Sequence, residues 1–169
     1  DVAVVNRHRM VDGCEVCPGS TLVVPRSTFL RIGPFDERLR RLEDWEWMIR
    51  YLASYPLAIV PEVLADIAPS GYGDPGLVSE AATRMRSQLM PEIRAQFGGG
   101  VARRFKSSIA IYTAAALFQD HRYIASAGRL LTAALLSPSR VFNWGRGLAR
   151  SLSGSRFLES TTAISPRGR

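Results

Sequence analysis

The chain has 169 residues, enough for one domain or for one domain with a helical extension. Apolar residues make up 46% and charged residues 22%, which excludes an intrinsically disordered chain and predicts a buried core. The formal net charge is +7, carried by 21 arginines and one lysine against 15 acidic residues. A basic balance permits nucleic acid, anionic lipid or phosphorylated ligands but selects none of them. Because no recognisable nucleic-acid motif accompanies it, we expect no nucleic-acid partner.

Two further features bear on the compartment. The longest apolar-leaning stretch, residues 109–118, is about half a membrane span, and the first residues lack the pattern of a signal peptide. Cys14 and Cys17 form a single CxxC pair without the second ligand pair of a zinc site or the strand–helix context of a redox centre. We therefore expect two ordinary reduced cysteines in a cytoplasmic protein.

Short strands and helices are expected to alternate in the first part of the chain. The expected strands are 21–25, 57–60 and 63–68. A short helix capped by Ser27 and ended by Gly33 follows the first strand. Residues 43–54 predict an amphipathic helix with an apolar stripe, and within it Glu46 and Arg50 have the spacing of an i,i+4 ion pair.

The remainder of the chain is expected to be helical. The expected helices are 78–90, 91–97, 101–119, 122–136 and 139–152, with a break at the three consecutive glycines 98–100. The organisation that follows is an α/β unit over residues 1–76, a helical annex over 77–152 and a disordered tail over 153–169, which is rich in Ser, Gly and Arg.

The segment 18–66 carries the residues with the clearest chemical meaning. The candidate functional residues are Gly19, Ser20, Asp36, Glu43, Asp44, Trp45 and Arg50. Paired carboxylates beside indole rings suit sugar chemistry, because indoles stack on pyranose faces and carboxylates bind or deprotonate hydroxyls. The alternative is structural: acidic residues in a first helical turn complement the helix dipole, and a tryptophan on an apolar stripe belongs to the core.

As a set, the segments GS, IGPFDERL and LEDWEWMIRYL resemble the C-terminal half of the catalytic domain of family 2 glycosyltransferases. The resemblance covers about residues 15–70 and implies the GT-A fold, an α/β nucleotide-sugar-binding sheet. It implies that a sugar is transferred with inversion from a nucleotide-sugar donor to a glycan or lipid-linked acceptor, in bacterial polysaccharide or cell-envelope biosynthesis. The Gln-x-x-Arg-Trp of processive synthases is absent, so we expect a non-processive enzyme.

The resemblance also implies residue roles. Asp44 would be the general base that takes the proton from the acceptor hydroxyl, and Glu43 would orient it or contact the acceptor. Gly19 and Ser20 would line the cleft between donor and acceptor.

Three further residues receive roles from the same resemblance. Trp45 would wall the acceptor side, Arg50 would brace the acidic pair, and Asp36 would lie on the loop beside the cleft as a mainly structural residue.

The chain departs from the family pattern in two places. The family holds Mg²⁺ or Mn²⁺ on the donor diphosphate through an Asp-x-Asp, which this chain lacks, so no metal-ligating residue can be assigned. The histidine that many members carry after the last strand is also missing, since residues 66–72 read DIAPSGY. We therefore expect the C-terminal part of a larger enzyme, inactive on its own.

The alternative hypothesis is a non-catalytic helical binding module. Residues 101–136 have the spacing of a single tetratricopeptide-like hairpin, and the basic helix 139–152 suits an anionic membrane surface. In this hypothesis the annex docks a partner protein or the membrane, and the acidic pair is structural. A peripheral contact with the inner membrane would also suit an enzyme that uses a lipid-linked acceptor.

Overall fold

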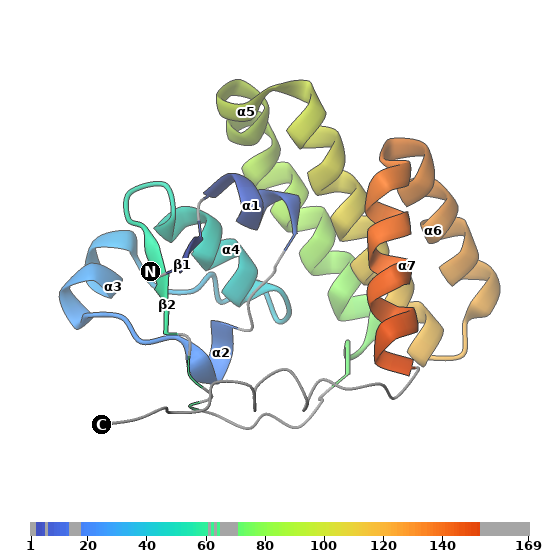
Figure 1. Ribbon diagram of the computed structural model, residues 1–169, viewed down its shortest axis with the longest axis horizontal. Coiled ribbons are helices and arrows are strands. Elements are labelled where there is room, and N and C mark those ends of the chain that lie inside the picture. The colour runs from blue at the N-terminus through green and yellow to red at the C-terminus, as the bar shows by residue number, and fades with distance from the viewer. Residues whose placement is uncertain are drawn as a thin grey trace, which may run out of the picture.

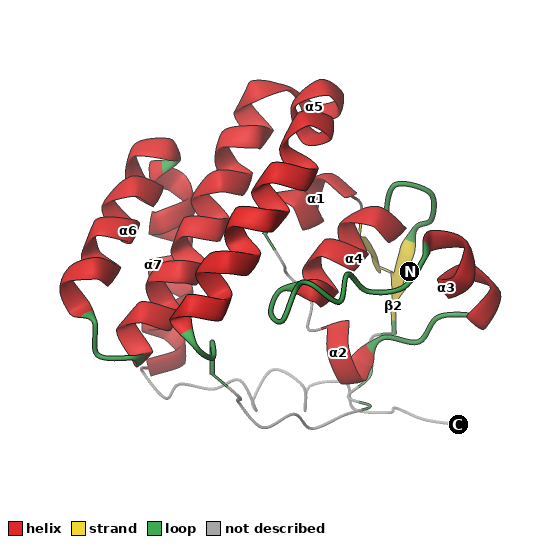
Figure 2. Cartoon of the chain, turned by 180° about the vertical axis from the view of Figure 1, so that it is seen from behind, coloured by secondary structure: helices red, strands yellow, loops and turns green. Residues whose placement is uncertain are grey.

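The computed structural model describes residues 3–5, 7–13, 18–60, 62, 64 and 71–152. Helices make up most of this part of the chain (Figures 1 and 2). The elements in order are β1 (Ala3–Val5), α1 (Arg7–Asp12), α2 (Pro18–Thr21), α3 (Arg26–Ile32), α4 (Glu43–Tyr51), β2 (Leu57–Ile59), α5 (Pro75–Gln119), α6 (Tyr123–Leu136) and α7 (Pro138–Leu152).

The long helix α5 reverses direction at Gly98, so that its two arms, residues 75–97 and 99–119, lie side by side (Figure 1). Gly98 has φ 80° and ψ 175°, a conformation that is essentially open only to glycine. The predicted break at the glycine run is therefore confirmed. Asp74 caps the start of α5, where its side chain accepts a hydrogen bond of 2.8 Å from the Leu77 amide.

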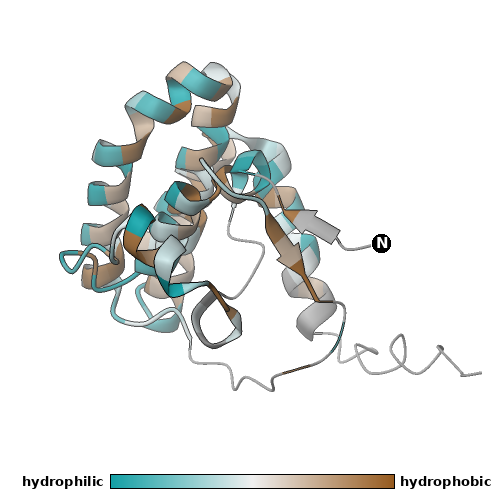
Figure 3. Cartoon of the chain, turned by 90° about the vertical axis from the view of Figure 1, so that its left-hand side faces the viewer, coloured by the Kyte–Doolittle hydropathy of each residue, from teal (hydrophilic) through white to brown (hydrophobic). Residues whose placement is uncertain are grey.

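The core lies where α1 and α4 pack against α5. Its largest fully buried side chains include Met10, Trp45, Trp47, Met48, Ile49, Met85, Ile93 and Phe105. Hydrophilic and apolar positions alternate along the helices in Figure 3, as amphipathic packing requires. The expected helix at 43–54 is present as α4, which ends at Tyr51, and residues 45–49 are all buried. Residues of the expected α/β unit and of the expected annex thus share one core.

The α6 and α7 helices cover the second arm of α5. Small side chains allow α6 to approach closely: the buried Ser107 hydroxyl donates to the Ala133 carbonyl at 2.9 Å, and the buried Ser126 hydroxyl donates to the Ala114 carbonyl at 2.8 Å. The predicted helices 122–136 and 139–152 are confirmed within one residue at each end.

The expected α/β class, with a partial GT-A-like sheet, is wrong for the described residues. They contain one antiparallel pair of three-residue strands, in which Ala3 lies opposite Ile59 and Val5 opposite Leu57. A two-stranded ribbon of this length has no crossover connection and cannot form a nucleotide-binding sheet.

The predicted strand 21–25 shows the physical reason for this error. Residues 18–21 form the helical turn α2, residues 22–25 pair with no described strand, and the Val23 side chain is 93% exposed. A β-branched run becomes a strand only where a second strand pairs with it and a core covers its face. Of the expected strand 63–68, residues 63 and 65–68 lie outside the described residues, as does the tail 153–169.

Candidate functional site

The two predicted catalytic carboxylates open α4. Leu42, in the left-handed conformation with φ 61°, turns the chain into the helix without a side-chain cap. Glu43 and Asp44 follow as half-buried residues, and the Asp44 Oδ1 accepts a hydrogen bond of 2.6 Å from the Trp45 amide. Neither carboxylate forms an ion pair with another described residue.

Trp45 points from α4 into the interior of the protein. It is only 1% exposed, and its indole Nε1 donates to the Met10 carbonyl at 2.7 Å. Its ring centre lies 5.7 Å from that of Phe105 and 5.8 Å from that of Tyr112, both on the second arm of α5. Trp45 is therefore anchored in the core and presents only part of its ring to the cavity described below.

Arg50 forms the ion pair predicted from its spacing and not the contact with the Glu43–Asp44 pair that the resemblance implies. Its guanidinium pairs with the buried Glu46 at 2.7 and 2.9 Å, which confirms the predicted i,i+4 pair. It also donates to the carbonyls of Ile32 (2.9 Å), the last residue of α3, and of Pro34 (2.8 Å). The side chain thus joins α4 to the end of α3 and does not contact either carboxylate of the Glu43–Asp44 pair.

Asp36 holds its own turn together. Its carboxylate accepts two hydrogen bonds from the Arg38 guanidinium at 2.8 and 2.9 Å, a third from the Arg38 amide at 3.0 Å and a fourth from the Gln88 side chain at 3.1 Å. These bonds, chiefly those from the Arg38 side chain, hold the pKa of Asp36 well below its ordinary value. These contacts join the turn after α3 to Gln88 on α5.

Gly19 and Ser20 lie in α2, which packs against α4. Gly19 departs from helical dihedral angles, with φ −8° and ψ −107°, and a Cβ at this position would meet no atom within 4 Å. The structure therefore brings the turn that contains both residues next to the helix that carries the two carboxylates.

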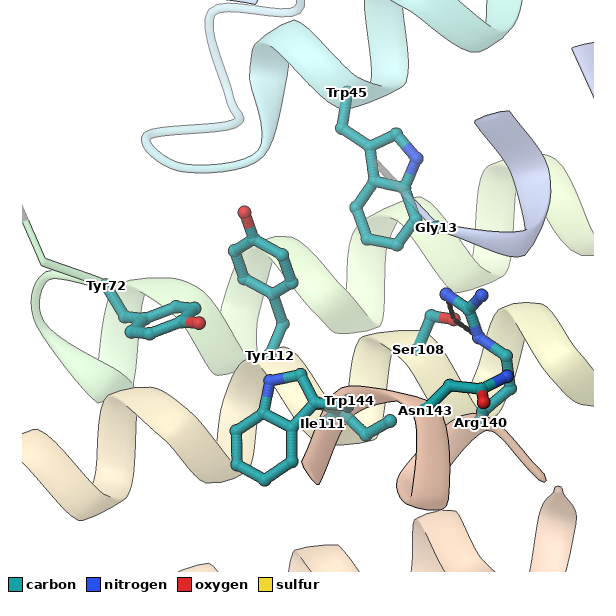
Figure 4. A pocket seen from close by; sticks show the side chains of 9 residues that line it. All are labelled: Gly13, Trp45, Tyr72, Ser108, Ile111, Tyr112, Arg140, Asn143 and Trp144. Atoms are coloured by element: carbon teal, nitrogen blue, oxygen red, sulfur yellow. Dashed lines mark hydrogen bonds between the residues drawn. The ribbon is translucent and has the colours of Figure 1, made fainter. Parts of the chain in front are cut away.

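A cavity of about 360 Å³ opens beside Trp45 (Figure 4). Its described lining comes from α4, the second arm of α5, α7, the end of α1 and the segment before α5, and it includes neither Glu43 nor Asp44. The lining residues are Gly13, Trp45, Tyr72, Ser108, Ile111, Tyr112, Arg140, Asn143 and Trp144. We call this cavity the aromatic pocket. Of this lining, the sequence predicts only Trp45 as a site residue, and it places Arg140 and Trp144 in the basic helix suited to a membrane surface. The pocket could not be predicted, because its residues meet only through the reversal at Gly98 and the packing of α7.

The described residues do not provide the cation site that the resemblance implies. Among them, no three His, Cys, Asp or Glu side chains lie close enough together to hold a metal ion. Cys14 and Cys17 lie outside the described residues.

No protein-family model, curated protein or solved structure matches the chain. Within the described part of the chain, no helix is both long and apolar enough to cross a membrane.

Proposed function

We propose that this chain carries the acceptor-activating part of an inverting, non-processive glycosyltransferase, which moves a sugar from a nucleotide-sugar donor to a glycan or lipid-linked acceptor. The observation that supports it most directly is the state of the acidic residues of α4. Glu43 and Asp44 are half-buried and form no ion pair with a described residue, whereas Glu46 in the same turn is neutralised by Arg50. Two of the three carboxylates are thus left for a hydroxyl-bearing ligand.

In this proposal Asp44 acts as the general base. It takes the proton from an acceptor hydroxyl while that oxygen bonds to the anomeric carbon of the donor, and the bond from this carbon to the nucleoside diphosphate breaks on the opposite face. Glu43 orients the acceptor, and the turn with Gly19 and Ser20 bounds the cleft. The donor, and the divalent cation that would stabilise its leaving diphosphate, are held by residues outside those described.

Replacement of the base tests the proposal. In the full-length protein, Asp44→Asn is expected to lower transfer by at least about 100-fold, the range typical of a lost general base, while donor binding persists. The measurement is release of nucleoside diphosphate from a panel of UDP-, GDP- and dTDP-sugars in the presence of a glycan acceptor mixture. Glu37→Gln, an exposed change in the turn before α4, is the matched control and should leave transfer unchanged. Full activity of Asp44→Asn would remove Asp44 from the mechanism.

A second candidate function, docking on an anionic membrane surface, has its own observations. Residues 121–152 contain five arginines and no acidic residue. On α6, Ile124, Leu131 and Leu135 are spaced to share one face, and their side chains are 92%, 63% and 79% exposed. An exposed apolar helix face within a basic segment is typical of helices that lie in the lipid headgroup layer. Each basic residue near such a surface contributes about 1 kcal/mol.

Vesicle binding tests this second candidate. The chain is expected to sediment with vesicles of phosphatidylcholine and phosphatidylglycerol at low salt. It is expected to dissociate from them in about 0.5 M salt, because salt screens the contacts between arginines and anionic headgroups. Ile124→Asp together with Leu131→Asp should abolish binding, whereas Val23→Asp, at an equally exposed apolar site in the first part of the chain, should not. Absence of binding to anionic vesicles at low salt would contradict the candidate.

A further inference from the structure

The aromatic pocket has the size of a site for a small molecule. Its volume of about 360 Å³ lies near the lower end of the range of ligand pockets, about 300–1,000 Å³. That space accommodates one or two sugar rings and is small for a complete nucleotide sugar. A ligand here would therefore be a sugar unit or a molecule of similar size.

Aromatic rings form much of the wall. Tyr72 and Tyr112 meet edge to face with ring centres 5.2 Å apart, and Tyr112 lies 5.8 Å from Trp45. Figure 4 shows these rings and the half-buried Trp144 around the same space, although they come from separate segments of the chain. Aromatic faces pack against the C–H surfaces of pyranose rings, so this wall suits a carbohydrate.

The other end of the pocket carries a guanidinium that is held in place. Arg140 donates to the Ser108 hydroxyl through Nε at 3.1 Å and through Nη2 at 2.9 Å, and that hydroxyl donates to the Asp12 carbonyl. A Cβ on residue 13 would overlap the Arg140 Nη2, so the glycine leaves the space that the guanidinium occupies. The side chain is thus positioned by two separate elements, α1 and the second arm of α5.

Arg140 has no anionic partner among the described residues. Arginines 7, 38, 50 and 104 each pair with a carboxylate, whereas the contacts of Arg140 are with a neutral hydroxyl. Asn143 adds an amide group at the same end of the pocket. A positioned cation facing a cavity, without its own carboxylate, is suited to an anion on the ligand.

We propose that the aromatic pocket binds a sugar ring that carries an acidic group, with the ring against Tyr72, Tyr112 and Trp144 and the acidic group on Arg140. The acidic group is a carboxylate, as in a uronic acid, or a phosphate ester. The inference deepens the proposed function by adding that the acceptor contains an acidic sugar, and this part of the inference rests on the proposed function. Binding itself requires no catalysis.

Titration of the whole 169-residue chain followed by tryptophan fluorescence and ligand-observed NMR tests this inference. The probes are methyl glucuronide, glucose 6-phosphate, methyl glucoside and inorganic phosphate. At least one acidic sugar is expected to bind tenfold or more tightly than methyl glucoside, and the tighter of the two identifies the acidic group. Equal binding of acidic and neutral sugars, or binding of inorganic phosphate as tight as that of the sugars, would overturn the inference.

Variants assign the effect to the pocket. Arg140→Met should reduce the preference for acidic sugars to less than twofold, and Trp144→Leu should weaken binding of all the sugars. Arg146→Met, at an exposed arginine of the same helix, should change neither. The wild-type comparison decides the matter even if Arg140→Met fails to fold. Loss of transfer in Asp44→Asn together with no preference for acidic sugars would refute this inference and support the proposed function. Full transfer in Asp44→Asn together with a preference for acidic sugars would refute the proposed function and support binding of acidic sugars in the pocket.

Discussion

Residues 1–120 hold 14 basic and 14 acidic side chains, whereas residues 121–169 hold eight basic residues and one acidic residue, so the last 49 residues carry the whole formal net charge of +7. In the first part, charges are matched across the fold: Arg7 pairs with Glu92, and Arg104 pairs with Asp12. In the described part of residues 121–169, helices α6 and α7 contain arginines and no acidic residue.

Both parts leave some large apolar side chains in solvent, such as Val23 and Leu64 in the first part. The first part also contains the larger core, in which Trp47 is fully buried and stacks on Phe29 and Tyr51 with ring centres 5.6 and 5.4 Å apart. On α6, Ile124 and Leu131 remain largely exposed. Charges in the first part are therefore balanced largely within the chain, whereas α6 and α7 combine unmatched positive charge with exposed apolar side chains, which suits an external partner.

Removing a large side chain from each part gives the largest expected difference. Trp47→Ala should lower the free energy of unfolding by about 3–5 kcal/mol, because it deletes a fully buried ring and leaves a cavity. Leu131→Ala should change that free energy by no more than about 0.5 kcal/mol, because its side chain is mostly in solvent. Urea denaturation measures both free energies, and a similar loss in the two variants would contradict this difference between the core and the surface of α6.

Removing one arginine from each part gives a smaller difference. Arg7 is 7% exposed and donates to the Ile49 carbonyl at 3.0 Å, to Glu92 at 2.7 Å and to Gln96. Arg7→Met keeps much of the apolar stem but loses these bonds. It is expected to lower the free energy of unfolding by about 2 kcal/mol. Arg146→Met removes an exposed guanidinium that lies over the Phe142 ring, and should cost about 0.5 kcal/mol or less. Thermal unfolding followed by circular dichroism compares the two, and an equal shift of Tm would contradict the distinction.

The smallest expected effect depends on pH. The lowered pKa of Asp36 means that its bonds to Arg38 and Gln88 stabilise the fold at pH values above its ordinary value of 3.8, and that this stabilisation is lost as the pH falls through the lower pKa of the folded state. Asp36→Asn should therefore be less stable than the natural chain at pH 7, and the difference should shrink as the pH falls below about 4.

Arg129→Gln on α6 is the matched control for the pH experiment. Because this change removes no carboxylate, its effect on stability should show no comparable change between pH 7 and pH 3. Parallel urea titrations at several pH values provide the measurement. A constant difference between Asp36→Asn and the natural chain at all these values would contradict the assignment.

The features that could be predicted from the sequence depend on neighbours within a few turns. The helix break at Gly98, the end of α3 at Gly33 and the Glu46–Arg50 pair are of this kind, and all three are present in the structure. The strand at 21–25 was predicted wrongly, because a strand needs a distant partner that the local pattern does not specify. The aromatic pocket could not be found in this way, since Gly13 and Arg140 meet only through tertiary packing.

The uneven distribution of charge can be found from the sequence alone, but a search for clusters of arginine does not find it. The arginines are spread along the whole chain, and what changes after Asp120 is the absence of acidic residues up to Glu159. Counting both signs by segment shows the boundary directly.

The hydrogen bonds between α1 and the two arms of α5 have a consequence for the order of folding. The bonds from α1 to the arms of α5 join residues 85 to 96 positions apart, whereas α5 and α6 contact each other mostly through residues that are closer in sequence. Closing a long loop costs more entropy and slows folding, so we expect α5 and α6 to form early and α1 to dock late. Pulse-labelling hydrogen exchange would then show the amides of α1 protected after those of α6. Since Gly13 follows α1, the cavity around Arg140 would be completed only in this last step, and a chain arrested before it would have the helices but no binding site.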